Sequence, residues 1–262
     1  MKKSTANISL IVLILSSIFF CQTAWAHDLW MTVAPYVIDK TDPPSLAIFS
    51  AHRFPAGAED YLAADRLDQV FLVTPSGAKV TASAKADGVF GSKAHLTEIG
   101  TYLAVAIPRD GFATKTTEGY QRGKTKKDVD NAIECRYSRK FAKAVFTVGH
   151  PASDLVSKPL GHAMEIVPLK NPASLKNGDV LPVKVLLQGK PARTFVYGTY
   201  AGFSESANTY AYTTRTDKEG IAAIKMIHDG VWVLIAKQEE AYPDAAECDK
   251  QAWAASLTFQ IR

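Results

Sequence analysis

Short stretches of strand-forming residues, each closed by a turn, run along most of this chain and limit it to a β-rich fold. Regularly spaced short strands separated by Gly, Pro and Asp turns are typical of a sandwich. Only one short helix is expected, near residues 61–68, because no segment carries a sustained helical stripe of apolar residues. The sequence therefore predicts an all-β protein. The expected strands cover residues 45–53, 68–74, 78–84, 101–107, 139–148, 180–187, 194–200, 221–227, 231–236 and 252–261.

The strand pattern is interrupted at residues 149–159, where Pro151 and Pro159 discourage regular structure. We interpret this segment as the connection between two β-sandwich halves. The prediction is an N-terminal β-sandwich domain over residues 27–160 and a C-terminal immunoglobulin-like β-sandwich domain over residues 161–262. About seven strands in the second half suit an immunoglobulin-like sandwich.

A long polar loop is expected at residues 109–131, which are rich in Lys, Thr and Gly and show no periodicity. Loops of this length in compact domains are usually functional or mobile. The run KTKKD at residues 124–128 could contact an acidic partner. A simple solvated loop is the preferred interpretation.

The first 26 residues resemble a cleavable leader. Two lysines precede an apolar stretch at residues 8–20, and the A-W-A motif at residues 24–26 fits the small-x-small cleavage rule. Cleavage between Ala26 and His27 would send the protein to the periplasm. The apolar stretch is shorter than the roughly 20 residues needed to span a bilayer, so we do not expect the mature protein to span the membrane.

The charge balance gives no case for nucleic acid as a partner. The whole chain has a formal net charge of +4. Residues 1–26 contain two lysines and no acidic residue, so their removal lowers the charge to +2. A nearly neutral chain lacks the basic surface that nucleic-acid binding requires.

Two cysteines follow the leader, Cys135 and Cys248. An even number of cysteines in an exported chain predicts a disulfide. The enclosed loop is longer than 100 residues, for which loop-closure entropy gives about 4–5 kcal/mol of stabilisation. A redox or metal-binding thiol pair is the alternative, and the absence of a C-x-x-C motif makes it the less favoured one.

A histidine at the start of the mature chain is a candidate metal ligand. The α-amine and the ring Nδ1 of His27 can close on one metal ion, and such nitrogen donors suit Ni, Cu or Zn. The α-amine titrates near pH ~8, so a metal can displace its proton at neutral pH. A frayed terminus is the alternative. A strand at residues 28–31 would oppose fraying, with Leu29 and Met31 facing the core and Asp28 and Trp30 facing outward.

Two more histidines complete the predicted metal ligands. His52 follows a strand and precedes a Pro-Gly turn, and a strand end presents a ligand on a rigid scaffold. His27 and His52 together would give the three nitrogens of a histidine brace, as in copper-dependent oxidases and copper chaperones. His162 is the third candidate. Asp28 could hydrogen-bond a ligand ring and fix its tautomer. The sequence contains neither H-x-x-H nor H-E-x-x-H, so ligands would have to come from separate strands.

Six segments distributed over the chain resemble one bacterial periplasmic family. This family is named domain of unknown function 4198 (DUF4198) and is grouped with the periplasmic portion of NikM-type nickel transport proteins. The resemblance implies an exported β-sandwich protein and no established reaction. The family often shows Gly-His where His162 stands. The segments are HDLWM at 27–31, AHRFPAG at 51–57, GTYLAVAIPRDGF at 100–112, CRYSRKFAKAVFTVG at 135–149, GHAMEIVPLKNPASLKNGD at 161–179 and TDKEGIAAI at 216–224.

Three function hypotheses follow. The first is a protein that binds a divalent transition metal (Ni, Cu or Zn) and assists its uptake or handling, with a metal permease as partner. The second is a non-catalytic adaptor for an envelope protein or an outer-membrane receptor, based on the long basic loop and on the aromatic residues of the second half. The third is a histidine-brace copper oxidase. No nucleophile elbow or phosphate loop is present, so we otherwise expect no enzyme. The oligomeric state is left open.

Overall fold

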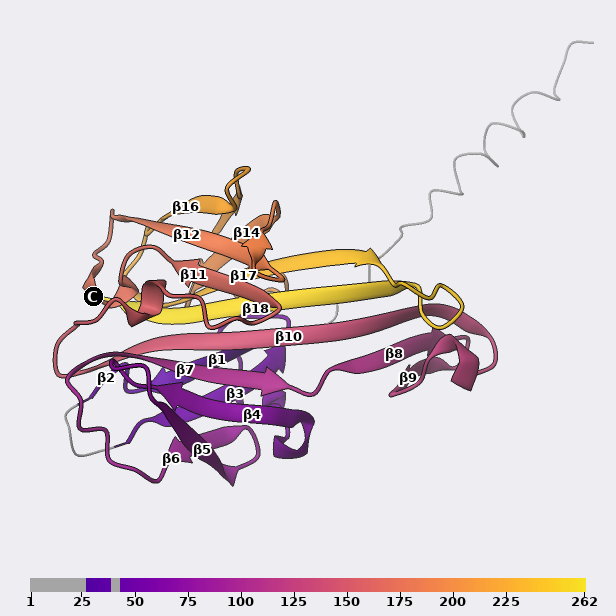
Figure 1. Cartoon of the computed structure of the whole chain (residues 1–262), viewed down its shortest axis with the longest axis horizontal. Coiled ribbons are helices and arrows are strands. Elements are labelled where there is room, and N and C mark those ends of the chain that lie inside the picture. The colour runs from indigo at the N-terminus through magenta and orange to yellow at the C-terminus, as the bar shows by residue number, and fades with distance from the viewer. Residues whose placement is uncertain (1–26, 39–42) are drawn as a thin grey trace, which may run out of the picture.

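The computed structural model describes residues 27–38 and 43–262, so the predicted leader at residues 1–26 lies outside the described residues. The described chain is built almost entirely from strands (Figure 1), which confirms the all-β prediction. The strands are β1 (Asp28–Ala34), β2 (Val37–Ile38), β3 (Ser45–Ala51), β4 (Leu67–Val73), β5 (Lys79–Ala86), β6 (Val89–Ser92), β7 (Gly100–Pro108), β8 (Gly111–Thr116), β9 (Gly119–Arg122), β10 (Ala132–Val148), β11 (Met164–Pro168), β12 (Val180–Leu187), β13 (Lys190–Pro191), β14 (Phe195–Tyr200), β15 (Tyr212–Arg215), β16 (Ile221–Lys225), β17 (Gly230–Ala241) and β18 (Lys250–Ile261).

The helical elements of the described chain are single 3-10 turns. They are η1 (Ala58–Asp60), η2 (Ala64–Arg66), η3 (Lys126–Asp128), η4 (Leu155–Ser157) and η5 (Pro172–Ser174). The helix expected near residues 61–68 is therefore only the turn η2, followed at once by β4. Within the part of the chain that is described, no helix has the length and apolar character needed to cross a membrane.

The centre of the molecule is the long strand β10, which joins two β-sandwich halves. It pairs with β7 in antiparallel orientation and with β18 in parallel orientation. One large sheet therefore runs β1-β3-β6-β5-β4-β7-β10-β18-β17-β14-β15, and a smaller sheet contains β11, β12, β13 and β16. Figure 1 shows the first half on one side of β10 and the smaller sheet on the other. The domain boundary at residue 160 stays a prediction.

Two hydrophobic cores lie on opposite faces of the shared strands. In β7, Leu103 belongs to the core of the second half, whereas its neighbour Ala104 belongs to the core of the first half. The same alternation places Phe141 in one core and Ala142 in the other, because successive side chains of a strand point to opposite faces. A strand that is buried on both faces has a continuous run of apolar residues in its sequence. This explains the unbroken run at residues 101–107.

The expectation of a long loop at residues 109–131 is wrong. This segment forms the hairpin β8–β9 and the turn η3. β8 pairs with the first part of β10, for example Thr114 with Cys135. Its polar composition misled the sequence reading, because backbone pairing with β10 holds this arm together while much of its surface, including all of β9, is exposed.

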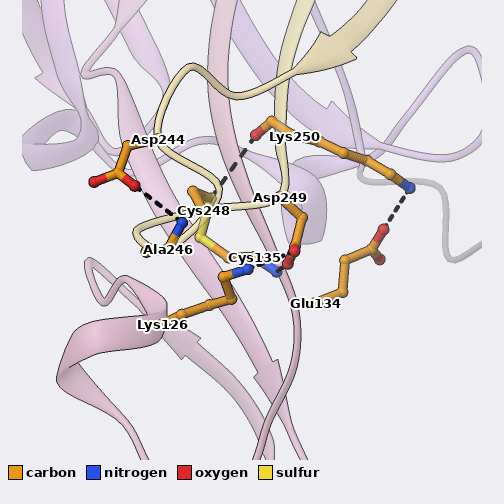
Figure 2. A network of polar contacts seen from close by, with 8 residues as sticks. All are labelled: Lys126, Glu134, Cys135, Asp244, Ala246, Cys248, Asp249 and Lys250. Carbon is orange, nitrogen blue, oxygen red and sulfur yellow. Dashed lines mark hydrogen bonds and ion pairs between the residues drawn. A yellow bond between two sulfur atoms is a disulfide. The ribbon is translucent and has the colours of Figure 1, made fainter.

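The predicted disulfide between Cys135 and Cys248 is confirmed, with a Cα–Cα distance of 4.8 Å. Polar contacts surround it (Figure 2). Lys126 Nζ lies 2.6 Å from Asp249 Oδ1, and the backbone N–H of Cys135 donates to Asp249 Oδ2 at 2.8 Å. Lys250 forms an ion pair with Glu134. The start of β10 is therefore bound covalently to the β17–β18 connection, and the arm is bound to it by the ion pair of Lys126.

Candidate functional site

The structure brings two of the three predicted metal ligands together. β1 and β3 pair in antiparallel register, with Asp28 opposite Ala51. The next position outward on each strand is a histidine, so His27 lies opposite His52. Their ring centroids are 4.1 Å apart and the ring planes are inclined by 30°. The strand pairing thus creates a two-imidazole site at one end of the sheet.

The nitrogen atoms of this pair are suited to a metal. His52 Nδ1 is buried and accepts or donates no hydrogen bond within the described structure. The carbonyl of His52 accepts a hydrogen bond from the backbone N–H of Asn208 at 2.7 Å, which fixes the backbone at this histidine. Burial lowers the pKa of His27, and the charges of His52 and Lys140 lower it further. A neutral imidazole is the form that binds metal.

Two imidazoles alone do not make a side-chain metal cluster. Among residues 27–38 and 43–262, no group of three or more His, Cys, Asp or Glu side chains could hold a metal ion. A third nitrogen would have to come from the α-amine of His27, which is free only after cleavage. The fit of a metal therefore depends on the terminus and on the unpartnered Nδ1 of His52.

Asp28 lies beside the histidines but does not play the predicted role. Its carboxylate is 4% exposed. Oδ1 forms an ion pair with Lys237 Nζ at 2.6 Å, and Oδ2 accepts a hydrogen bond from the Tyr210 hydroxyl at 3.1 Å. Burial and the charge of Asp28 raise the pKa of Tyr210. The two oxygens of the Asp28 carboxylate thus bind a lysine and a tyrosine rather than an imidazole within the described residues.

The expectation that Asp28 and Trp30 face outward is wrong. Trp30 is buried in a cluster with Phe49 and Phe54, and Val233 and Ile235 of β17 cover it. β1 is therefore covered on both faces, by the core of the first half and by β17. The sequence shows a strand here but not the element that covers its second face.

Lys140 of β10 fixes the backbone of the first ligand. Its Nζ donates a hydrogen bond to the carbonyl oxygen of His27 at 2.6 Å. Burial lowers the pKa of Lys140 to about 8, although the nearby Asp28 carboxylate acts in the opposite direction. The predicted start of the mature chain is thus attached to the central strand.

A pocket of about 440 Å³ opens beside His27. Its walls come from β1, β8, β9, β10, β14, β17 and β18, so it lies between the two halves and the arm. Sequence reasoning missed it, because these strands meet only in the folded chain. Its charged lining residues are Asp28, Lys115, Glu134, Arg136, Arg139, Lys140, Lys237, Glu239 and Lys250.

His162 lies apart from the other two predicted ligands. Its ring stacks on Phe141, with centroids 5.2 Å apart. Phe141 follows Lys140 in β10, so the two side chains point to opposite faces of the sheet, and Lys140 is the one that contacts His27. Burial lowers the pKa of His162 to about 4. The structure thus places His162 as a buried, neutral histidine in the core of the second half.

His162 is expected to make stability depend on pH. Its folded pKa of about 4 lies below the ordinary 6.5, so the unfolded chain binds the proton first as pH falls. The stability present above pH 6.5 is lost between pH 6.5 and 4, and the loss is about 2–3 kcal/mol. Urea unfolding of the wild type and His162→Gln at pH 7.5 and 4.5 measures it. Equal pH dependence in the two proteins would contradict this prediction.

Comparisons with known proteins identify one family. The family model described as "Domain of unknown function (DUF4198)" matches residues 24–240. No curated protein matches the sequence. Similar solved structures include murine CEACAM1b, with 11% identity over 90% of this chain and 99% of that chain, at a TM-score of 0.21. The D0-D1 domain of Intimin is 14% identical over 90% of this chain and 98% of that chain, also at a TM-score of 0.21.

Proposed function

The chain belongs to the DUF4198 family, and from this membership we propose that it is a metal-binding protein of the periplasm. In this proposal His27, His52 and the freed α-amine hold Ni, Cu or Zn, and a metal permease receives the ion. The observation that carries the proposal is the contact between the two imidazoles at 4.1 Å. Two histidines from different strands meet where the predicted mature chain begins.

The protein environment favours this use of the pair. The buried Nδ1 of His52 lacks a partner, which is costly unless a ligand satisfies it. The lowered pKa of His27 keeps its ring neutral at pH 7. Lys140 holds the His27 carbonyl, so the terminal residue is ordered before a metal arrives. The bound metal would supply a Lewis-acidic centre with further coordination positions open.

An added residue before His27 is expected to abolish tight binding. Mature protein that starts at His27 should bind one equivalent of Ni(II), Cu(II) or Zn(II). A chain with one alanine before His27 should bind at least about 100-fold more weakly, because the extension removes the free amine and the six-membered chelate ring that the amine, the metal and the imidazole Nδ1 form. Isothermal titration calorimetry of both proteins measures the difference.

The matched control for this experiment is His150→Ala, which removes an exposed histidine outside the pair. We expect it to bind metal like the wild type, whereas His52→Ala should bind weakly. Equal affinity of the extended and the natural terminus would refute the proposal. Reductant-dependent peroxide production by the copper-loaded protein would instead assign the site to a copper oxidase.

Exposed apolar residues of the arm and of the adjoining start of β10 favour the adaptor as a second candidate function. Tyr120 of β9 and Ile133 of β10 are both more than half exposed. Exposed apolar side chains on a rigid arm suit contact with an envelope protein. A partner retained by the His27→Ala protein in the presence of a chelator, and lost on Tyr120→Ser/Ile133→Ser, would support this role.

A further inference from the structure

The pocket beside His27 has a positive charge that the protein itself does not neutralise. Six basic and three acidic side chains line it. Lys237 pairs with Asp28 at 2.6 Å, and Arg136 pairs with Glu239 at 3.0 Å. The remaining lining carboxylate, of Glu134, pairs with Lys250.

Two lysines of the pocket have no carboxylate partner in the part of the chain that the structure describes. Arg139 pairs with Asp110, which is outside the lining, at 2.7 Å. Within the described residues, neither Lys115 nor Lys140 lies in an ion pair, and the only bonded partner of the Lys140 ammonium is the neutral carbonyl of His27. An anion with two negative charges would therefore balance the lining.

The pocket also offers apolar contact. Phe195 and Tyr120 line it and are about half exposed, although aromatic side chains of this size are usually covered. Tyr197 lines the same wall, next to Phe195. Aromatic rings of this kind pack against the carbon skeleton of a small ligand. The lining thus suits a compact organic anion better than an inorganic ion.

We propose that this pocket binds a small organic anion with two or more carboxylates. The inference rests on the proposed metal site in one respect: the anion there also supplies oxygen ligands to the metal held by His27 and His52. His27 lines the pocket, and Lys140 both contacts His27 and lines the pocket, so the two sites are adjacent. Nitrogen ligands from the protein leave open positions that carboxylate oxygens can fill. The protein would therefore bind its metal as a carboxylate complex.

Citrate is the probe for this proposal. Titration calorimetry of the protein starting at His27, metal-free and Ni(II)-loaded, should show citrate binding to both forms, at least about fivefold tighter to the loaded one. Lys115→Met should weaken citrate binding about fivefold, the size expected for an exposed ion pair. Lys218→Met, which removes an exposed lysine outside the pocket lining, should change nothing. Lys140→Met should weaken it more, because Lys140 is the less exposed of the two.

The outcomes separate this inference from the metal proposal. Failure to bind any of Ni(II), Cu(II) and Zn(II) overturns the metal site, while Lys115-dependent citrate binding to the same metal-free protein still supports the anion pocket. Absence of citrate binding, or binding that Lys115→Met leaves unchanged, overturns the pocket. Equal affinity for the metal-free and loaded forms, or removal of the metal by citrate, overturns the shared coordination.

Discussion

Replacing Lys143 with methionine is expected to lower the free energy of unfolding by about 3–5 kcal/mol. Lys143 Nζ lies 2.7 Å from Glu165 Oε1, and the two side chains are 2% and 1% exposed. The carboxylate also accepts hydrogen bonds from the backbone N–H groups of Leu160 and Gly161. Removing the lysine leaves the buried Glu165 carboxylate with its backbone hydrogen-bond donors but without a neighbouring cation. Urea unfolding at pH 7.5 measures the loss.

The double variant Lys143→Met/Glu165→Gln separates the charge from the packing. Glutamine keeps an oxygen for the backbone donors but carries no charge, so this protein should recover much of the stability lost in Lys143→Met. Lys127→Met is the matched control, because it breaks an exposed pair with Asp244 of similar length, 2.8 Å. It should leave stability nearly unchanged. A double variant no more stable than Lys143→Met would contradict the charge argument.

Removing the disulfide is expected to cost about 4–5 kcal/mol, because Cys135 and Cys248 are 113 residues apart and the bond restricts the unfolded chain over that whole loop. The test uses the double variant Cys135→Ala/Cys248→Ala. Alanine is chosen over serine because both sulfurs are fully buried, and serine would place hydroxyl groups in that site. Its unfolding midpoint in urea should fall well below that of the oxidised wild type.

Reductant provides the control for this experiment. The wild type with a phosphine reductant should approach the stability of the double alanine variant, and the variant itself should not respond. Unchanged stability of the reduced wild type would show that the ion pairs around the bond, such as Lys126 with Asp249, hold the arm without it.

Most strands could be predicted from the sequence, because the turn-forming residues that end a strand are its immediate neighbours in the chain. The strand at residues 180–187 has the predicted bounds, since a Gly-Asp turn precedes it and a Gln-Gly-Lys-Pro turn follows it. The predictions failed where contacts between residues far apart in the sequence determine the structure. The segment 109–131 is a hairpin because β10 pairs with it. Trp30 is buried because β17, about 200 residues later, covers it.

Of the candidate site, only the two histidines could be predicted from the sequence. His27 stood out because a terminal histidine is an unusual donor, and His52 because it ends a strand. The other members of the site are Lys140, Tyr210 and Lys237, which gave no local signal. They come from separate strands and loops and meet at His27 and Asp28 only through the pairing of β10 with β18 and of β17 with β18. His162 shares its residue type with the two predicted ligands His27 and His52 but lies on the other face of the sheet.

The parallel pairing of β10 with β18 also sets the order in which the molecule can be completed. The ribosome makes residues 27–52 first, yet β1 is covered by β17, and the Thr258 hydroxyl of β18 donates to the Met31 carbonyl. Pairings between the beginning and the end of a chain form slowly. A chain truncated before residue 230 would contain both histidines, but Asp28 would have no Lys237 and β1 would have one bare face. A nascent or clipped chain should therefore be unable to bind the proposed metal, and only the complete protein should bind it.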